Sequence, residues 1–82
     1  MDNQEIEQIE ADVTEIIAGQ LMFYKSEVTR HRHVRYNSSI VVDIEGKFNI
    51  ECDDWFESHN DPTVGDIIDM VIAEKVRKDA GS

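Results

Sequence analysis

The sequence has a single cysteine, a single proline and no long apolar run. Cys52 has no second cysteine to pair with, so an intramolecular disulfide is excluded, and a lone thiol suits the reducing cytoplasm. No uninterrupted apolar run exceeds four residues, so we expect neither a membrane span nor a secretory signal. One proline is too few for a linker, and 40% hydrophobic residues are too many for a disordered chain.

Positive charge is also scarce. The sequence has eight Lys and Arg residues and eighteen Asp and Glu residues, which gives a net charge of −10. This charge opposes binding to nucleic acid and anionic membranes and favours basic protein surfaces. Residues 30–35 hold three arginines, two histidines and no acid, so the chain without these three positive charges stands at −13. We interpret this block as a solvated loop neutralised by the acidic body, with a phosphate or nucleic-acid patch and an anchor for an acidic partner as alternatives.

The length of 82 residues predicts one domain near the small end of what folds unaided. Such a small core leaves little room for an internal active site. We therefore expect a protein that is not an enzyme and that works through its surface or through a single attachment point.

Two long amphipathic helices are predicted, one at each end of the chain. Each begins with a capping box, a pair of residues three apart whose side chains bond to each other's backbone N–H groups. The first box joins Asp2 to Glu5, and its helix should end near residue 20. The second joins Thr63 to Asp66, and its helix should end near Arg77, with a frayed tail over 79–82. Their apolar residues recur every three or four positions, as a buried helix face requires.

The middle of the chain predicts a long loop followed by a shorter helix. Residues 22–37 show no sustained period, and Val28 and Val34 are the expected anchors of this loop to the core. The helix is predicted from Ser38 to Lys47, with an early stop suggested by Gly46. Its apolar side consists of Ile40, Val41, Ile44 and Phe48.

A single helical turn is predicted over residues 53–58, tucking Trp55 and Phe56 inward, and a turn-forming cluster follows it up to Pro62. The fold expected for residues 1–82 is therefore an all-α bundle of three main helices plus one short helix, with a long loop between the first two helices.

Ser38 is the best-presented hydroxyl of the sequence. It comes just before the apolar stripe of the second predicted helix, where a hydroxyl can cap the first backbone N–H groups and still face water. We take Ser38 as the residue through which the protein works, by carrying a group rather than by catalysis.

Other chemistry is less well supported. Cys52 has apolar surroundings typical of a small core filler, and a catalytic thiol is the alternative. No zinc-site spacing joins it to the histidines, so no metal site is predicted. The acids of Asp43–Glu51 do not follow the calcium-loop pattern, because Gly46 is in the wrong place.

The chain resembles the acyl carrier proteins over nearly its whole length. In that family a first helix leads through a long loop to an Asp-Ser-Leu motif, a second helix, a short third helix and a fourth that opens with Thr-Val. Similar segments here are residues 16–21 with 25–29, residues 48–51 (Phe-Asn-Ile-Glu) and residues 63–69 (Thr-Val-Gly-Asp-Ile-Ile-Asp).

The serine motif departs from the family's pattern. The family reads roughly Asp-Leu-Gly-Ala-Asp-Ser-Leu, whereas residues 33–39 read His-Val-Arg-Tyr-Asn-Ser-Ser. About four residues are missing before the serine and about four after it, and the second loss removes roughly one turn of the helix. A rival alignment without that loss puts Val34 in the place of the serine, and the chain is then a degenerate, unmodified carrier that acts as an interaction module.

The resemblance implies a function and a site. A phosphopantetheinyl transferase would attach 4'-phosphopantetheine to Ser38, with Ser39 as second choice. Acyl intermediates of fatty-acid or related biosynthesis would then be held as thioesters on this arm. The protein would be a cytoplasmic monomer that delivers them to acyl-transferring enzymes through basic docking patches, with Asp43, Glu45 and Arg35 as its contact residues. Acyl chains would lodge between the helices, along Ile40, Ile44, Phe48, Ile68 and Ile72.

Overall fold

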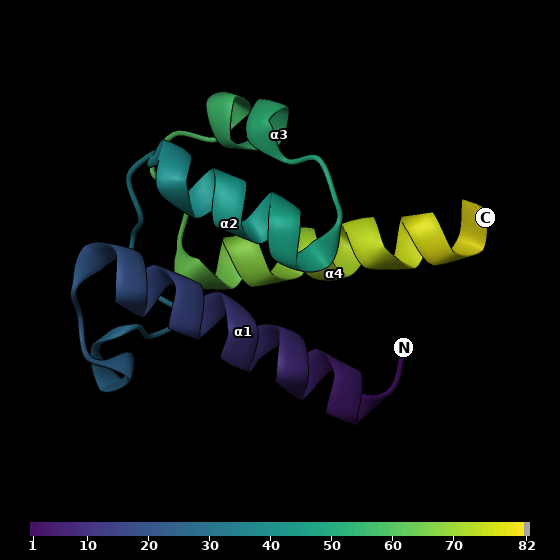
Figure 1. The fold of residues 1–82 in the computed structure, drawn as a ribbon, viewed down its shortest axis with the longest axis horizontal. Helices are drawn as coiled ribbons and strands as arrows, with labels where there is room; N and C mark the ends of the chain where they lie inside the picture. The colour runs from purple at the N-terminus through teal and green to yellow at the C-terminus, as the bar shows by residue number, and fades with distance from the viewer. Residues whose placement is uncertain (82) are drawn as a thin grey trace.

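Four α-helices account for most of residues 1–81, the part of the chain that this computed structural model describes (Figure 1). They are α1 (Asn3–Leu21), α2 (Ser38–Phe48), α3 (Asp53–Ser58) and α4 (Val64–Gly81), and a 3-10 turn, η1 (Lys25–Glu27), lies between α1 and α2. These residues contain no β-strand, only one isolated bridge between His33 and Thr63. The predicted all-α bundle of three main helices and one short helix is confirmed.

The helices run in alternating directions along the chain (Figure 1). α1 contacts both α2 and α4 and runs opposite to them (Figure 1). The end of α1 and the starts of α2 and α4 therefore lie at the same end. α3 lies beside α2, on the side away from α1 (Figure 1). No described helix is both long and apolar enough to cross a membrane.

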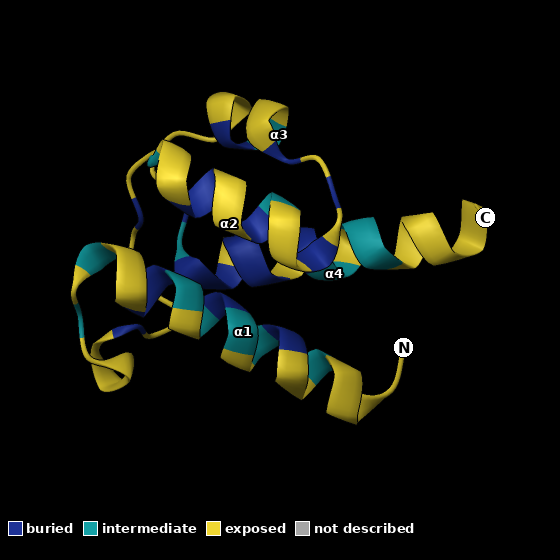
Figure 2. Cartoon of the chain, viewed as in Figure 1, coloured by how far each residue is buried: buried dark blue, intermediate teal, exposed yellow. Residues whose placement is uncertain are grey.

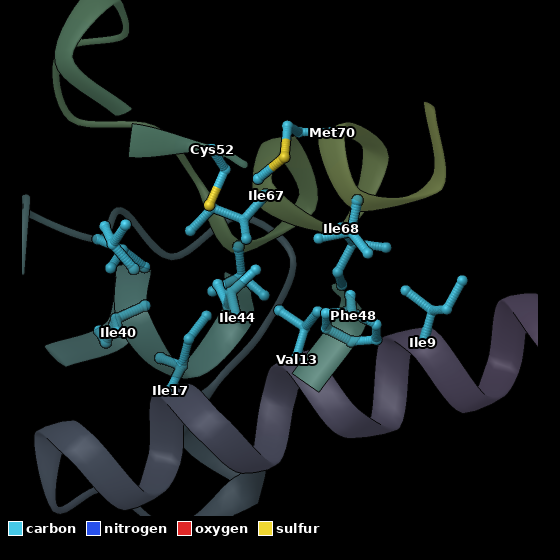
Figure 3. Close-up of a cluster of buried hydrophobic side chains, with 14 of the residues drawn as sticks. Ile9, Val13, Ile17, Ile40, Ile44, Phe48, Cys52, Ile67, Ile68 and Met70 are labelled. Carbon is cyan, nitrogen blue, oxygen red and sulfur yellow. The ribbon is translucent and has the colours of Figure 1, made fainter. Parts of the chain in front are cut away.

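One hydrophobic cluster holds the helices together. The buried residues lie on the facing sides of α1, α2 and α4 (Figures 2 and 3). Each fully buried aliphatic side chain contributes about 1.5–3 kcal/mol to folding. No polar or charged side chain of residues 1–81 is buried. The core is therefore apolar throughout, and its deepest members are Val13, Ile17, Ile44, Ile67 and Val71.

The two predicted helix starts are confirmed, the second with a full capping box and the first with the Asp2 side-chain bond alone. Asp2 Oδ1 accepts a hydrogen bond from Glu5 N at 2.8 Å. Thr63 Oγ1 accepts one from Asp66 N at 3.1 Å, while Asp66 Oδ2 accepts one from Thr63 N at 3.0 Å. Both starts were correctly predicted, because each depends on residues three apart.

One predicted helix end was close and one was wrong. α2 passes through Gly46 and ends at Phe48, one residue beyond the predicted Lys47, because Phe48 packs into the core and Asn49 then ends the helix in the left-handed conformation. α4 runs beyond Arg77 to Gly81. Its last turns are held to the end of α2, where Lys78 Nζ donates to the backbone oxygen of Asn49. The predicted fraying is therefore wrong for residues 79–81, and residue 82 lies outside the described part.

The long connection between α1 and α2 is fastened to the start of α4. Val28 and Val34 are buried, as predicted. Val34 N donates to Pro62 O at 2.7 Å, and Gly65 N donates to Arg30 O at 2.9 Å. A Cβ at Gly65 would lie 3.2 Å from Arg30 O, so a glycine permits this close approach. The connection is thus a fixed part of the fold.

Candidate functional site: the start of α2

Ser38 is the first residue of α2, and its side chain is exposed. Its hydroxyl has no hydrogen-bond partner within residues 1–81. The helix beneath it is fixed, because Ile40 and Ile44, two and six residues further on, are fully buried. The structure therefore presents an uncommitted hydroxyl on a rigid base.

Asn37, and not Ser38, caps α2. Asn37 Oδ1 accepts hydrogen bonds from Ser39 N at 2.9 Å and from Ile40 N at 3.3 Å. The predicted capping role of Ser38 is therefore wrong. Asn37 precedes the helix and has an extended backbone conformation. From there its side-chain oxygen reaches the N–H groups of the second and third helical residues. This assignment frees the Ser38 hydroxyl.

The alternative positions for the motif serine differ in their surroundings. Ser39, the second residue of α2, is exposed as well, and its hydroxyl also has no hydrogen-bond partner within residues 1–81. Val34, which the rival alignment would put in the serine's place, is only 2% exposed and lies four residues before the helix. Ser38, and not Val34, is thus the residue at the helix start.

An open hollow of about 520 Å³ lies beside this helix start. It is lined by residues just before α2 and by residues of α3 and the turn after it, namely Arg35, Tyr36, Phe56, Glu57, His59, Asn60 and Asp61. Tyr36 also ties the segment before α2 to α3, because its hydroxyl donates to Asp53 Oδ1 at 2.8 Å. This hydrogen bond raises the pKa of Tyr36 above its ordinary value.

The predicted contact residues have different surroundings. Asp43 is exposed and accepts a hydrogen bond from Gln20 of α1. Glu45 is half-buried, and its Oε2 accepts the backbone N–H of Cys52 at 2.9 Å, which joins α2 to the start of α3. Sequence reasoning missed this structural role, because the two residues are seven apart in an irregular segment. Arg35 is exposed and has no ion pair within the described chain.

α3 carries a cluster of three acids, one of which, Asp53, is bonded to Tyr36 just before α2. Asp53, Asp54 and Glu57 are exposed, and their carboxylate oxygens lie within 4.8 Å of one another. Exposed acids commonly gather in this way without an ion, so the cluster does not by itself indicate a metal site.

The predicted acyl cleft is filled by packed side chains. Ile40, Ile44, Phe48 and Ile68 are all buried and converge in the core (Figure 3). Ile72 is half-buried at the edge of the same cluster. An acyl chain between these helices would have to displace this packing.

Cys52 and the histidines do not form a reactive or metal-binding group. Cys52 is buried, and burial with the nearby carboxylates of Glu45 and Asp53 raises the pKa of its thiol to about 12. His33 Nδ1 lies 2.7 Å from the backbone oxygen of Asp61. His59 stacks on the Trp55 ring, with centroids 4.3 Å apart. The core-filler interpretation of Cys52 is confirmed.

Comparison with known proteins finds no matching family model, no similar curated protein and no similar solved structure. The case for a function therefore depends on the geometry around Ser38 and on the resemblance of its sequence motif.

Proposed function

We propose that the protein is a cytoplasmic acyl carrier, in which Ser38 holds a 4'-phosphopantetheine arm and delivers acyl groups to enzymes of fatty-acid or related acyl biosynthesis. The observation that carries this proposal is the exposed, unbonded hydroxyl of Ser38 at the first residue of α2. A modifying enzyme needs a hydroxyl that is accessible, fixed in place and free of structural duty. Asn37 makes this possible by capping the helix itself.

The surroundings of Ser38 fit a phosphodiester. The start of a helix carries partial positive charge, which favours a phosphate. Arg35, three residues earlier and without an ion pair in the described chain, adds a full positive charge. When bound, the arm supplies a thiol for acyl attachment. The protein's own residues supply the anchor, the phosphate's electrostatic partner and a rigid helix.

The filled core directs the arm to the outside of the bundle. Because Ile40, Ile44 and Phe48 leave no unfilled cleft between them, we place the arm on the side of the hollow beside Arg35 and Tyr36. The hollow's size of about 520 Å³ is within the range of small-molecule sites.

The exposed acids would guide partner enzymes to this end of the molecule. Asp43, halfway along α2, and the acids of α3 present exposed negative charge on these two helices. Such charge pairing speeds encounter and fixes register more than it tightens binding. Brief contacts suit a carrier that visits several enzymes. Glu45 contributes less, since its carboxylate is used within the fold.

The proposal is tested by loading the purified protein. It would be incubated with coenzyme A and a broad-specificity phosphopantetheinyl transferase, and its intact mass measured. We expect a gain of one phosphopantetheinyl group that Ser38→Ala abolishes and Ser39→Ala preserves. The reverse pattern would move the site to Ser39. No gain for the folded wild-type protein would contradict the carrier proposal.

A degenerate carrier that acts only as an interaction module is the second candidate. The observation in its favour is Ser39, a polar residue at the position where the carrier motif has leucine. This candidate predicts that a protein isolated from its native cells is unmodified. It further predicts that Ser38→Ala retains biological function, whereas Asp43→Lys loses it.

A further inference from the structure

Met22 ends α1 in the left-handed conformation, with its backbone N–H bonded to Ala18 O, and its own side chain is not buried. Three non-glycine residues have positive φ, and two of them are Asn49 and Asp61, residue types that tolerate this region. Met22 is the third, with a φ of 61° at the end of α1. A methionine is disfavoured there, and glycine is the usual choice. Its side chain is 89% exposed, so it gains no burial in return.

Tyr24, two residues further on, is also left in the solvent. Its side chain is 79% exposed, and its backbone oxygen accepts the N–H of Glu27 to begin η1. Between the two, Phe23 turns toward the core cluster. The two exposed side chains of Met22 and Tyr24 thus flank the partly buried Phe23 just after α1.

Arg32 lies over the same segment and is not neutralised. Its guanidinium carbon is 4.0 Å from the centre of the Phe23 ring, and Nη1 donates to the backbone oxygen of Glu27 at 3.4 Å. No carboxylate of the described chain pairs with it. Arg30, by contrast, is used within the fold, with Asp69 at 3.1 Å and Glu10 at 3.8 Å.

We propose that Met22, Tyr24 and Arg32 form a docking surface for an acidic segment of another protein. Arg32 would pair with a carboxylate, and Met22 and Tyr24 would cover an apolar side chain next to it. Methionine, tyrosine and arginine are enriched at protein interfaces, where a few such residues supply most of the binding energy. The left-handed backbone conformation of Met22 also supports a binding role, because selection for folding alone would favour glycine at this position. The proposal holds whether or not Ser38 is modified.

The charges favour an acidic protein over other anionic partners. Nucleic acid or an anionic membrane would present many negative charges to a chain that stands at −13 outside residues 30–35. A second copy of this chain carries the same net charge of −10 and would be repelled. A short acidic segment can pair locally with Arg32, against the repulsion of Glu27, the single acid of η1.

The test begins with a displayed library of random peptides selected on the full chain. We expect enriched peptides with Asp or Glu next to an apolar residue. A synthetic peptide of that sequence would be titrated by fluorescence anisotropy against variants. Arg32→Glu and Tyr24→Ser should weaken binding by roughly tenfold or more, while Glu27→Gln should strengthen it. Lys47→Glu, an equal charge reversal near the far end of α2, should leave it unchanged.

Met22→Gly separates a binding role from a structural one. It should raise the melting temperature, because glycine relieves the left-handed conformation, and at the same time weaken peptide binding. A variant that binds equally well would overturn the proposal, as would selection of peptides without acidic residues.

Three controls address other occupants. Tighter binding of a single-stranded oligonucleotide, or of vesicles containing phosphatidylserine, would overturn the acidic-protein assignment. So would concentration-dependent self-association in sedimentation velocity that Arg32→Glu abolishes.

Discussion

At the level of single residues, the start of α2 divides two roles between neighbours. Asn37 supplies the cap, and Ser38 supplies a hydroxyl with no part in the fold. We predict that Asn37→Ala lowers the free energy of unfolding by about 1 kcal/mol, a usual loss for a removed cap. Ser38→Ala should change it by less than about 0.5 kcal/mol. Urea denaturation of the two variants measures both values.

Asn37→Asp is the matched control for this pair, because aspartate caps as well as asparagine and should preserve stability. A loss of stability for Ser38→Ala as large as that for Asn37→Ala would mean that the Ser38 hydroxyl serves the fold. It would then be a poor attachment point.

Cys52 gives a second prediction at this scale. Because its thiol is buried and its pKa is raised to about 12, the reactive thiolate is scarce at neutral pH. We expect iodoacetamide to label Cys52 only when the protein unfolds, which intact-mass measurements with and without urea would show. Above the ordinary thiol pKa the unfolded chain loses a proton that the folded chain keeps. The thiol's contribution to stability should therefore fall as pH rises above about 9. Rapid labelling of the native protein would contradict this account of the core.

At the level of elements, the capping box of α4 should make stability depend on acid. The backbone N–H and hydroxyl of Thr63 hold the pKa of Asp66 below its ordinary value. As pH falls, the Asp66 carboxylate is therefore protonated at a higher pH in the unfolded chain than in the folded chain. The stabilisation present at neutral pH is lost progressively below about pH 5. Asp66→Asn should flatten this dependence, measured as the urea midpoint against pH. An unchanged slope for Asp66→Asn would contradict this role of the capping box.

The helices could be predicted where the residues that determine them lie close together in the sequence. Both starts of the long helices and the burial of Val28 and Val34 follow from residues close in sequence. The ends of α2 and α4 do not, because Phe48 continues its helix through core packing and Lys78 bonds to Asn49, twenty-nine residues away. A glycine such as Gly46 is a weak stop when the next turn is buried. The ends of elements here depend on tertiary contacts.

The candidate site was predictable in part for a similar reason. A serine before an apolar helical stripe is visible in sequence, and so Ser38 was found. The identity of the cap was not, since Asn37 and Ser38 are both good capping residues and only the backbone geometry separates them. The partners of Arg30 and the exposure of Met22 require the folded chain. No periodic pattern marks either one.

At the level of the whole molecule, the exposed Ser38 hydroxyl and the proposed surface of Met22, Tyr24 and Arg32 belong to the same end of the bundle, because the end of α1 and the start of α2 lie together there. The helices pack around one apolar core, with a radius of gyration of 12.0 Å, close to the value of about 12 Å expected for a folded chain of this length. We therefore propose that partners are recognised on the surface, with the Ser38 hydroxyl as the point of covalent attachment.

The most direct test of this account is the mass of the protein purified from its native cells, with fragmentation to locate any modification. The account predicts one phosphopantetheinyl group, free or acylated, on the peptide that contains Ser38. An unmodified Ser38, in protein isolated without any step that removes thioesters or phosphodiesters, would contradict it.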